Sequence, residues 1–221
     1  MKHRKPPEGQ KIMKKSRQIS LGMDYETEWH QKGFRSIAGI DEVGRGPLAG
    51  PVIAAAVILP LHNIPEGLND SKQLSAKRRE ELFDQIMELA HIGIASVPPS
   101  LIDSINIRQA SLLAMRQAFS ALEEKPDMAL VDGRDMPDLP CKTIAIIKGD
   151  SKIASIAAAS IIAKVTRDRL MKNISTFFPE YFFEKNAGYG VEAHRAALEK
   201  YGPTHCHRFT FSPVRQKTFN R

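Results

Sequence analysis

Two adjacent carboxylates, Asp41 and Glu42, end an apolar run, and a glycine-rich turn with one arginine, Gly44-Arg45-Gly46, follows at once. Neighbouring acids repel each other and are hard to remove from water, so an ordinary strand end rarely carries such a pair. Divalent cations prefer carboxylate oxygens, and glycines let the backbone approach a ligand closely. The segment therefore predicts a metal site beside a loop that reads a phosphate or a sugar.

Two further acids follow expected strands. Asp132 comes after an apolar run and precedes Gly133, and Asp150 lies between a strand and a long helix. Ligands of α/β proteins collect where strands end, and four converging carboxylates would suit two divalent ions. Each acid also has a plain alternative, because Asp150 could cap the following helix and Asp132-Gly133 could be an ordinary turn.

Asp168 is a competing fourth acid. It lies 18 residues beyond Asp150, near the far end of the same expected helix. A helical rise of about 1.5 Å per residue separates the two by roughly 20–27 Å, too far to share one pair of ions. We expect Asp168 to form an ion pair with Arg167, Arg169 or Lys164, although Lys164 could also reach a phosphate.

Apolar runs alternate with amphipathic segments, which predicts an α/β fold with a mixed central sheet flanked by helices. The first two strands are separated only by the glycine loop, so they should form a hairpin. The small residues of 153–164 predict close helix-to-sheet packing. The expected strands are 36–41, 52–59, 92–97, 128–131 and 143–147, and the expected helices are 75–90 (with Ser75 as N-cap), 106–122, 153–171 and 192–200.

The expected organisation is a basic, disordered tail over residues 1–20, an N-terminal extension with a short helix over 21–35, and one main domain over 36–221. The 221-residue chain has a net charge of +7, and most of the excess lies at its ends, since residues 1–20 carry seven Lys/Arg against one acid. An acidic centre between basic segments suits a polyanionic substrate, although a basic tail can simply be solvated.

Composition excludes several classes of protein. No run of 18 apolar residues could span a membrane, and the charged N-terminus lacks the apolar core of a secretory signal. The two cysteines, Cys141 and Cys206, are far apart, which favours a reduced, cytoplasmic location. His205-Cys206-His207 lacks a second ligand pair at zinc spacing, so His207-Arg208 is better interpreted as structural or as a phosphate contact.

Residues 40–51 (IDEVGRGPLAGP) resemble the signature of bacterial ribonuclease HII, the type 2 ribonucleases H. The resemblance runs in order over about residues 21–215 and includes six further blocks: 69–75 (NDSKQLS), 131–133 (VDG), 148–151 (KGDS), 158–168 (AASIIAKVTRD), 188–190 (GYG) and 207–208 (HR). It implies a ribonuclease H-like fold, a mixed β-sheet flanked by α-helices, with a helical C-terminal part.

The resemblance also implies an activity. Members cleave RNA paired to DNA and nick on the 5′ side of single ribonucleotides in duplex DNA, leaving a 5′-phosphate and a 3′-hydroxyl. Asp41, Glu42, Asp132 and Asp150 would be the catalytic acids that bind two Mn²⁺ or Mg²⁺ ions. The expected partners are RNA–DNA hybrids and ribonucleotide-containing duplexes, with a sliding clamp as a candidate protein partner and a monomeric enzyme.

The same resemblance assigns substrate contacts. Gly44, Arg45 and Gly46 would read the ribose 2′-hydroxyl, the group that separates RNA from DNA. Tyr189 would pack on the neighbouring deoxyribose. Ser71 and Lys72 precede a helix and are candidate phosphate ligands, with plain turn chemistry as the alternative.

Three departures from the family pattern, at Gln73, Asn186-Ala187 and Val191, fall on expected nucleic-acid contacts and leave the metal acids intact. A sister enzyme, ribonuclease HIII, is one alternative, but it usually carries a larger N-terminal domain than the 35 residues before the first strand here. The other alternative is a non-catalytic nucleic-acid binder in which the acids serve as turns and caps.

Overall fold

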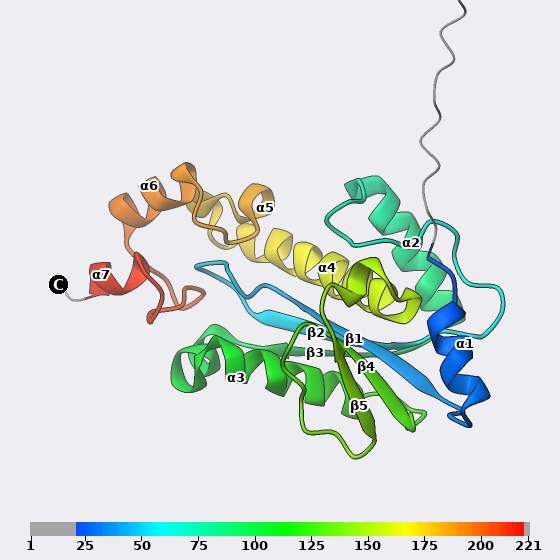
Figure 1. Ribbon diagram of the computed structural model, residues 1–221. Helices are drawn as coiled ribbons and strands as arrows, with labels where there is room; N and C mark the ends of the chain where they lie inside the picture. The colour runs from blue at the N-terminus through cyan, green and yellow to red at the C-terminus, as the bar shows by residue number, and fades with distance from the viewer. Residues whose placement is uncertain (1–20, 219–221) are drawn as a thin grey trace, which may run out of the picture.

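The chain forms a five-stranded sheet with helices on both faces in this computed structural model, which describes residues 21–218 (Figure 1). The predicted basic tail, residues 1–20, lies outside the described residues. The strands are β1 (Ile37–Val43), β2 (Val52–Ile58), β3 (His91–Val97), β4 (Met128–Asp132) and β5 (Lys142–Ile146). The main helices are α1 (Asp24–Gln31), α2 (Ala76–Leu89), α3 (Pro99–Ser120), α4 (Ala154–Ser175), α5 (Phe183–Asn186), α6 (Glu192–Tyr201) and α7 (Val214–Thr218).

The sheet is mixed, as predicted. Its strand order is β3-β2-β1-β4-β5, with β1 antiparallel to β2 in the expected hairpin and parallel to β4 on its other side. β3 pairs antiparallel with β2, and β5 pairs parallel with β4. This order places β1, which carries Asp41 and Glu42, at the centre of the sheet, so both its edges are hydrogen-bonded to neighbouring strands.

Apolar side chains from alternate strand positions form one core on each face. Ala38 and Ile40 point toward α3, whereas Ile53 and Val57 point toward α2 and α4. Figure 1 shows α3 on one side of the sheet and α4 on the other. The strand β2 is buried along its whole length, which explains its near-continuous apolar sequence.

The contact between α4 and β1 is very close, which confirms the predicted packing of the small residues. A Cβ atom on Gly39 would lie 2.2 Å from the backbone carbon of Ser155 and 2.3 Å from the backbone nitrogen of Ile156. The glycine in β1 therefore lets the start of α4 rest directly on the central strand, and this fixes the turn that precedes the helix.

Two helix starts show what local sequence can and cannot predict. The Ser75 hydroxyl accepts a hydrogen bond from the backbone N–H of Arg78, so the predicted N-cap of α2 is confirmed. The helix α3 begins earlier than predicted, at Pro99, and is broken at Asn106 (φ 66°, ψ 162°). The Asn106 side chain then caps the main part by accepting from the N–H of Gln109 at 3.1 Å, so the predicted start marks this internal cap.

The short helix expected in the N-terminal extension is α1, and it supports α4. The Glu26 side chain is buried, and its Oε1 accepts the backbone N–H of Ser155 at 2.9 Å, in the first turn of α4. The N-cap residue of α4, Ile153, has no capping side chain. A carboxylate from a distant segment thus takes over the role that an N-cap residue normally has.

The C-terminal part is helical, as predicted, and has its own small core. Tyr181, Phe183, Leu198 and Val214 pack together with Leu48 and Ala49 of the glycine loop. The C-terminal helices therefore pack directly against the loop that follows the paired acids. No helix within residues 21–218 is long and apolar enough to cross a membrane.

Candidate active site

The four predicted acids lie near the C-terminal ends of β1 and β4 and in the turn after β5. β1 and β4 run parallel with Ile40 opposite Val131, so Asp41 and Asp132 come next to each other where the strands end. Asp132 Oδ1 accepts the N–H of Gly149 at 2.7 Å, and this bond holds the 3₁₀ turn Gly149–Ser151, which carries Asp150, against the end of β4.

Their charges act on one another. Burial, then the charges of Glu42 and Asp132, raises the pKa of Asp41 well above its usual range. Burial raises the pKa of Glu42 to about 7, with Asp132 adding to the rise and Arg45 opposing it. Burial, then Asp70 and Asp132, also raises the pKa of Asp150. This edge would be stabilised by added positive charge.

Two serines support Asp41 from behind. Asp41 accepts hydrogen bonds from its neighbour's backbone N–H at 2.7 Å and from the Ser160 hydroxyl of α4. The hydroxyls of Ser160 and Ser71 lie 2.8 Å apart, and Ser71 is buried. The Ser71 hydroxyl therefore contacts Ser160, which in turn donates a hydrogen bond to Asp41. This arrangement does not favour the predicted phosphate contact of Ser71.

Lys72 is the exposed residue of this turn. Its Nζ lies 3.8 Å from Asp150 Oδ2, and its side chain is 77% exposed. Burial lowers the pKa of Lys72, but Asp70, Asp150 and the acids beyond them outweigh burial and raise it. Asp70 was not predicted as a site residue, although it acts on both Lys72 and Asp150.

Asp150 is not the N-cap of α4, whereas Asp168 forms the ion pair that the sequence predicts. Asp150 lies in its own turn before α4 and does not cap that helix, whose N-cap is Ile153. Asp168 Oδ1 receives the Lys164 ammonium at 2.7 Å, in the expected ion pair. Lys164 is thus engaged with Asp168.

The carboxylates are the residues at this site that could bind a metal ion. Within residues 21–218 no three His, Cys, Asp or Glu side chains are gathered tightly enough to hold a metal ion as they stand. The superficially metal-like His205-Cys206-His207 segment offers no ligand from His207, because both of its ring nitrogens have protein partners.

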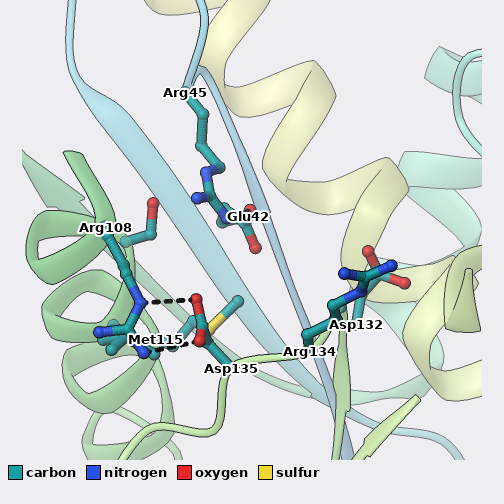
Figure 2. Close-up of a pocket in the computed structure, with 10 residues that line it drawn as sticks. Glu42, Arg45, Arg108, Met115, Asp132, Arg134 and Asp135 are labelled. Atoms are coloured by element: carbon teal, nitrogen blue, oxygen red, sulfur yellow. Dashed lines mark hydrogen bonds and ion pairs between the residues drawn. The ribbon is translucent and has the colours of Figure 1, made fainter. Parts of the chain in front are cut away.

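A cavity of about 270 Å³ opens beside the acids. Figure 2 shows Arg45 above Glu42, and Arg108 in a two-pronged ion pair with Asp135. Arg45 Nη1 lies 3.3 Å from Glu42 Oε1, and Arg108 bonds Asp135 at 2.9 and 2.6 Å. Three arginines line this cavity, the third being Arg134, so its wall suits an anionic chain passing over the acids.

The glycine loop is held by a buried arginine that sequence reasoning left undecided. Arg208 is fully buried and donates to the carbonyl oxygens of Gly44 (2.5 Å), Arg45 (2.9 Å) and Gly50 (3.0 and 2.9 Å). Burial, then the nearby Arg167 cation, lowers the pKa of Arg208 to about 9. Of the two predicted roles for this residue, the structural one agrees with the contacts.

A second buried arginine, Arg167, completes this support. It donates to the carbonyls of Pro51 (3.0 Å), Ala49 (3.1 Å) and Ala187 (2.9 Å), and so joins the loop to the Tyr189 segment. Gly44 has a φ of 94°, and a Cβ there would lie 2.3 Å from the Arg167 Nε. Only glycine allows the loop to lie this close to the guanidinium.

The structure brings Tyr189 to the glycine loop. A Cβ on Gly46 would lie 3.6 Å from the Tyr189 ring, and the Gly188 carbonyl accepts the N–H of Leu48 at 2.8 Å. The Tyr189 side chain is 42% exposed, so its ring remains available to a ligand. Of the predicted sugar-reading residues, Gly46 and Tyr189 therefore lie next to each other, Arg45 is exposed beside them, and Gly44 is buried beneath the loop.

At Asn186, one of the departures from the family pattern, the side chain has a structural role. It is buried, donates to the Tyr181 carbonyl at 2.7 Å and accepts the N–H of Gly188 at 2.8 Å. The residue therefore shapes the turn that leads to Tyr189.

Comparison with known proteins gives one family. The family model for Ribonuclease HII matches residues 38–214. A ribonuclease HII of Agrobacterium fabrum is 55% identical over 201 residues, covering 90% of this chain and 93% of the relative. A ribonuclease HII of Rhizobium leguminosarum bv. trifolii is 51% identical over 219 residues, with 98% and 94% covered.

Solved structures agree on the fold. The ribonuclease H2 of Pyrococcus horikoshii superposes with a TM-score of 0.71 at 28% identity, covering 82% of this chain and 96% of the other. The ribonuclease HII in a complex with PCNA from Archaeoglobus fulgidus gives 0.65 at 27% identity, with 80% and 96% covered. A Bst-RNase HIII in complex with Mn²⁺ gives 0.66 at 20% identity, with 86% and 71% covered, a likeness of fold. The chain therefore belongs to the ribonuclease HII family, and it is a ribonuclease H endonuclease that cleaves RNA in RNA–DNA hybrids.

Proposed function

We propose that this enzyme also nicks duplex DNA on the 5′ side of a single embedded ribonucleotide, and that Asp41, Glu42, Asp132 and Asp150 hold two divalent ions for this reaction. One observation carries the proposal. Asp41 and Glu42 lie within a few residues of a glycine loop whose carbonyls are hydrogen-bonded by Arg208, and Tyr189 lies against that loop. Hydrolysis and the reading of a sugar can therefore act on the same nucleotide.

The acids fit divalent cations. Their donor atoms are carboxylate oxygens, which Mg²⁺ and Mn²⁺ prefer, and the charge repulsion that raises the pKa of Asp41 would be relieved by a cation. When bound, the ions would activate a water molecule and stabilise the leaving 3′-oxygen. The Mn²⁺ complex of Bst-RNase HIII adds support from the same fold.

The chain's own residues supply recognition. Backbone groups of Gly44, Arg45 and Gly46 lie on a loop whose carbonyls are fixed by Arg208, so they can meet a 2′-hydroxyl without rearranging. The exposed ring of Tyr189 would pack on the adjacent deoxyribose and crowd a sugar that carries a hydroxyl. Lys72, exposed beside Asp150, would contact a phosphate.

A nicking assay tests the proposal. Wild-type protein with Mn²⁺ or Mg²⁺ should cut a DNA duplex with one ribonucleotide on its 5′ side and leave a 5′-phosphate. Asp132→Asn should reduce cleavage by on the order of a thousandfold or more, because it removes a group that acts in the transition state, yet retain measurable substrate binding. Asp168→Asn is the matched control, since that aspartate is paired with Lys164 away from the acids.

Each other outcome has a defined meaning. Cleavage of RNA–DNA hybrids but not of the embedded ribonucleotide would reject the proposed substrate and favour a ribonuclease HIII-like specificity. Retained cleavage by Asp132→Asn would reject the metal assignment. Binding without any metal-dependent cleavage would contradict both.

A sliding clamp is a further proposed partner, supported only by the PCNA complex of the Archaeoglobus fulgidus relative. Size-exclusion chromatography of the full chain, alone and with a bacterial clamp, would test this partner together with the predicted monomer. Co-elution supports the clamp, and separate elution at the size of one chain rejects it.

A further inference from the structure

Two buried histidines, His194 on α6 and His207 before Arg208, face each other behind Tyr189. Both side chains are fully buried, and their Nε2 atoms lie 3.0 Å apart. At the outer end of His207, Nδ1 lies 3.0 Å from the backbone nitrogen of Thr204. At the outer end of His194, Nδ1 lies 2.9 Å from the Tyr189 carbonyl oxygen. The four groups form one continuous chain of hydrogen bonds.

The partners at the two ends assign every proton in this chain. A backbone N–H can only donate, so His207 Nδ1 must accept from Thr204. The neutral His207 then carries its proton on Nε2 and donates it to His194 Nε2. His194 in turn carries its proton on Nδ1 and donates to the Tyr189 carbonyl, which can only accept. Only this pair of tautomers satisfies all the contacts.

The pair cannot take up an additional proton and keep its hydrogen bonds. Protonating either ring would set two N–H groups against each other across the 3.0 Å gap. Burial, then the neighbouring His194, lowers the pKa of His207 to about 4, and burial also lowers the pKa of His194. The rings are packed against Tyr181 and Phe183 rather than against a carboxylate. Both rings are therefore neutral at neutral pH, and the hydrogen bonds all run in one direction, from Thr204 to Tyr189.

The chain of bonds ends at the backbone of the residue that meets the glycine loop. The Tyr189 carbonyl accepts from His194 and from the N–H of Val191 (2.8 Å), so its orientation is fixed from two sides. The adjoining Gly188 carbonyl is bonded to Leu48. At the other end, His207 forms a β-bridge with Ala49 of the same loop. The histidine pair thus connects the backbone of Tyr189, through His194 and His207, to Ala49 of the loop.

We propose that the His207–His194 relay is a positioning device for Tyr189, and that it sets the preference for an embedded ribonucleotide over a uniform RNA–DNA hybrid. The inference rests on the proposed contact between Tyr189 and a deoxyribose. That contact exists only at a junction, because in a uniform hybrid the neighbouring sugar carries a hydroxyl. Neither histidine contacts the substrate, so both are positioning residues.

A double-mutant cycle tests the relay. His194→Phe keeps a flat buried ring but removes the donor to Tyr189, and it should lower kcat/KM on the embedded ribonucleotide relative to the hybrid by about tenfold, the loss of one buried hydrogen bond. In a Tyr189→Ala background the same change should have no further effect on this ratio. The ratio is measured within one preparation, so a smaller folded fraction cancels.

Matched variants separate positioning from stability. His194→Asn can place an amide N–H near the position of Nδ1, so it should retain much of the preference that His194→Phe loses. His205→Phe is the control in the neighbouring segment, because His205 is exposed and contacts the ring of Phe178 instead. An equal loss on both substrates, or an effect of His194→Phe that adds to that of Tyr189→Ala, overturns the proposal. Should His194→Phe not fold, His207→Phe, which removes the donor to His194, enters the same cycle with the same expected loss.

A second readout is independent of the proposed substrate. Imidazole ¹⁵N shifts of the wild-type protein should show His194 protonated on Nδ1 and His207 on Nε2, and His194→Phe should shift the Tyr189 ring resonances. If wild type fails to nick the embedded ribonucleotide, the proposed function is rejected and these shifts still decide the relay. Other tautomers, or an unmoved Tyr189 resonance, reject the relay.

Discussion

Asp41 is the residue whose environment least suits a cation-free protein. It is almost fully buried, and two neighbouring carboxylates add to the effect of burial in raising the pKa of its side chain. The Ser160 hydroxyl and one backbone N–H only partly offset this. An unpaired buried charge of this kind is unfavourable to folding, and it remains so until a cation is bound.

Asp41→Asn should therefore stabilise the cation-free protein while removing activity. We expect a gain on the order of 1–2 kcal/mol in the free energy of unfolding, measured by urea denaturation in EDTA. With Mn²⁺ the wild type should gain stability and the variant should not. Asp168→Asn serves as the control and should gain nothing in EDTA. A less stable Asp41→Asn protein would contradict the interpretation of this residue.

Arg208 is a different case, a buried charge whose side chain donates its hydrogen bonds to backbone carbonyl oxygens. Its planar fork reaches the carbonyls of Gly44, Arg45 and Gly50 together. Arg208→Lys keeps the charge, but its shorter side chain carries its donors on one atom and lacks the planar fork that reaches the three carbonyls. We expect KM for the embedded ribonucleotide to rise at least about fivefold, since one or more buried carbonyls lose their donor. Arg215→Lys, on the exposed start of α7, is the comparison variant and should leave KM unchanged.

These residues show what the sequence could predict of the site. The four acids were predictable because Asp41, Glu42 and Asp132 lie in the last residues of apolar strands and Asp150 in the turn after β5, and neighbouring strand ends of one sheet meet. Arg167 and Arg208 were not, because a buried arginine that binds carbonyls and an exposed one that binds phosphate look alike in sequence. Ser71 was chosen for its turn, and only the three-dimensional contact with Ser160 shows where its hydroxyl is directed.

At the scale of elements, the sheet and its helices follow from periodicity, whereas some helix boundaries do not. The β1–β2 hairpin and the Ser75 cap were predicted because the signals are local. The earlier start of α3 was missed because the break at Asn106 interrupts the helical pattern. The cap of α4 could not be found locally at all, since Glu26 lies 129 residues away from Ser155 in sequence.

Glu26→Ala should destabilise the protein by about 1–2 kcal/mol, the range for removing a helix N-cap. Glu26→Gln should lose less, because its amide oxygen can still accept the N–H of Ser155. Urea unfolding of both variants measures the difference. Glu28→Ala removes only an exposed ion pair with Lys32 and should change stability by no more than about 0.5 kcal/mol. Equal effects at positions 26 and 28 would argue against the remote cap.

At the scale of the whole molecule, the histidine pair links folding to pH. An unfolded His207 takes up a proton near its usual pKa of 6.5, whereas burial, then His194, lowers the folded pKa to about 4. The unfolded state binds more protons between these values, so this contribution is present above pH 6.5 and is lost as the pH falls toward 4. Its full size is on the order of 3 kcal/mol.

Urea unfolding of wild type and His207→Gln at pH 7.5, 6 and 5 measures this term by difference. The gap in unfolding free energy between the two proteins should narrow steadily as the pH falls. Taking the difference removes the contribution of the acids, which both proteins share. His62→Gln, at an exposed histidine in another part of the chain, should run parallel to wild type, and a His207→Gln protein that does the same would contradict the buried neutral pair.

The residue that fixes the glycine loop, Arg208, is synthesised long after the loop and the four acids. The four carboxylates are all synthesised before residue 151, whereas the groups that fix the loop, around 204–208, come more than 50 residues later. On the proposed assignment, a chain emerging from the ribosome would carry all four acids before it carries Arg208, the residue that fixes the glycine loop. The proposed selectivity would then be acquired later in synthesis than the proposed set of metal-binding acids.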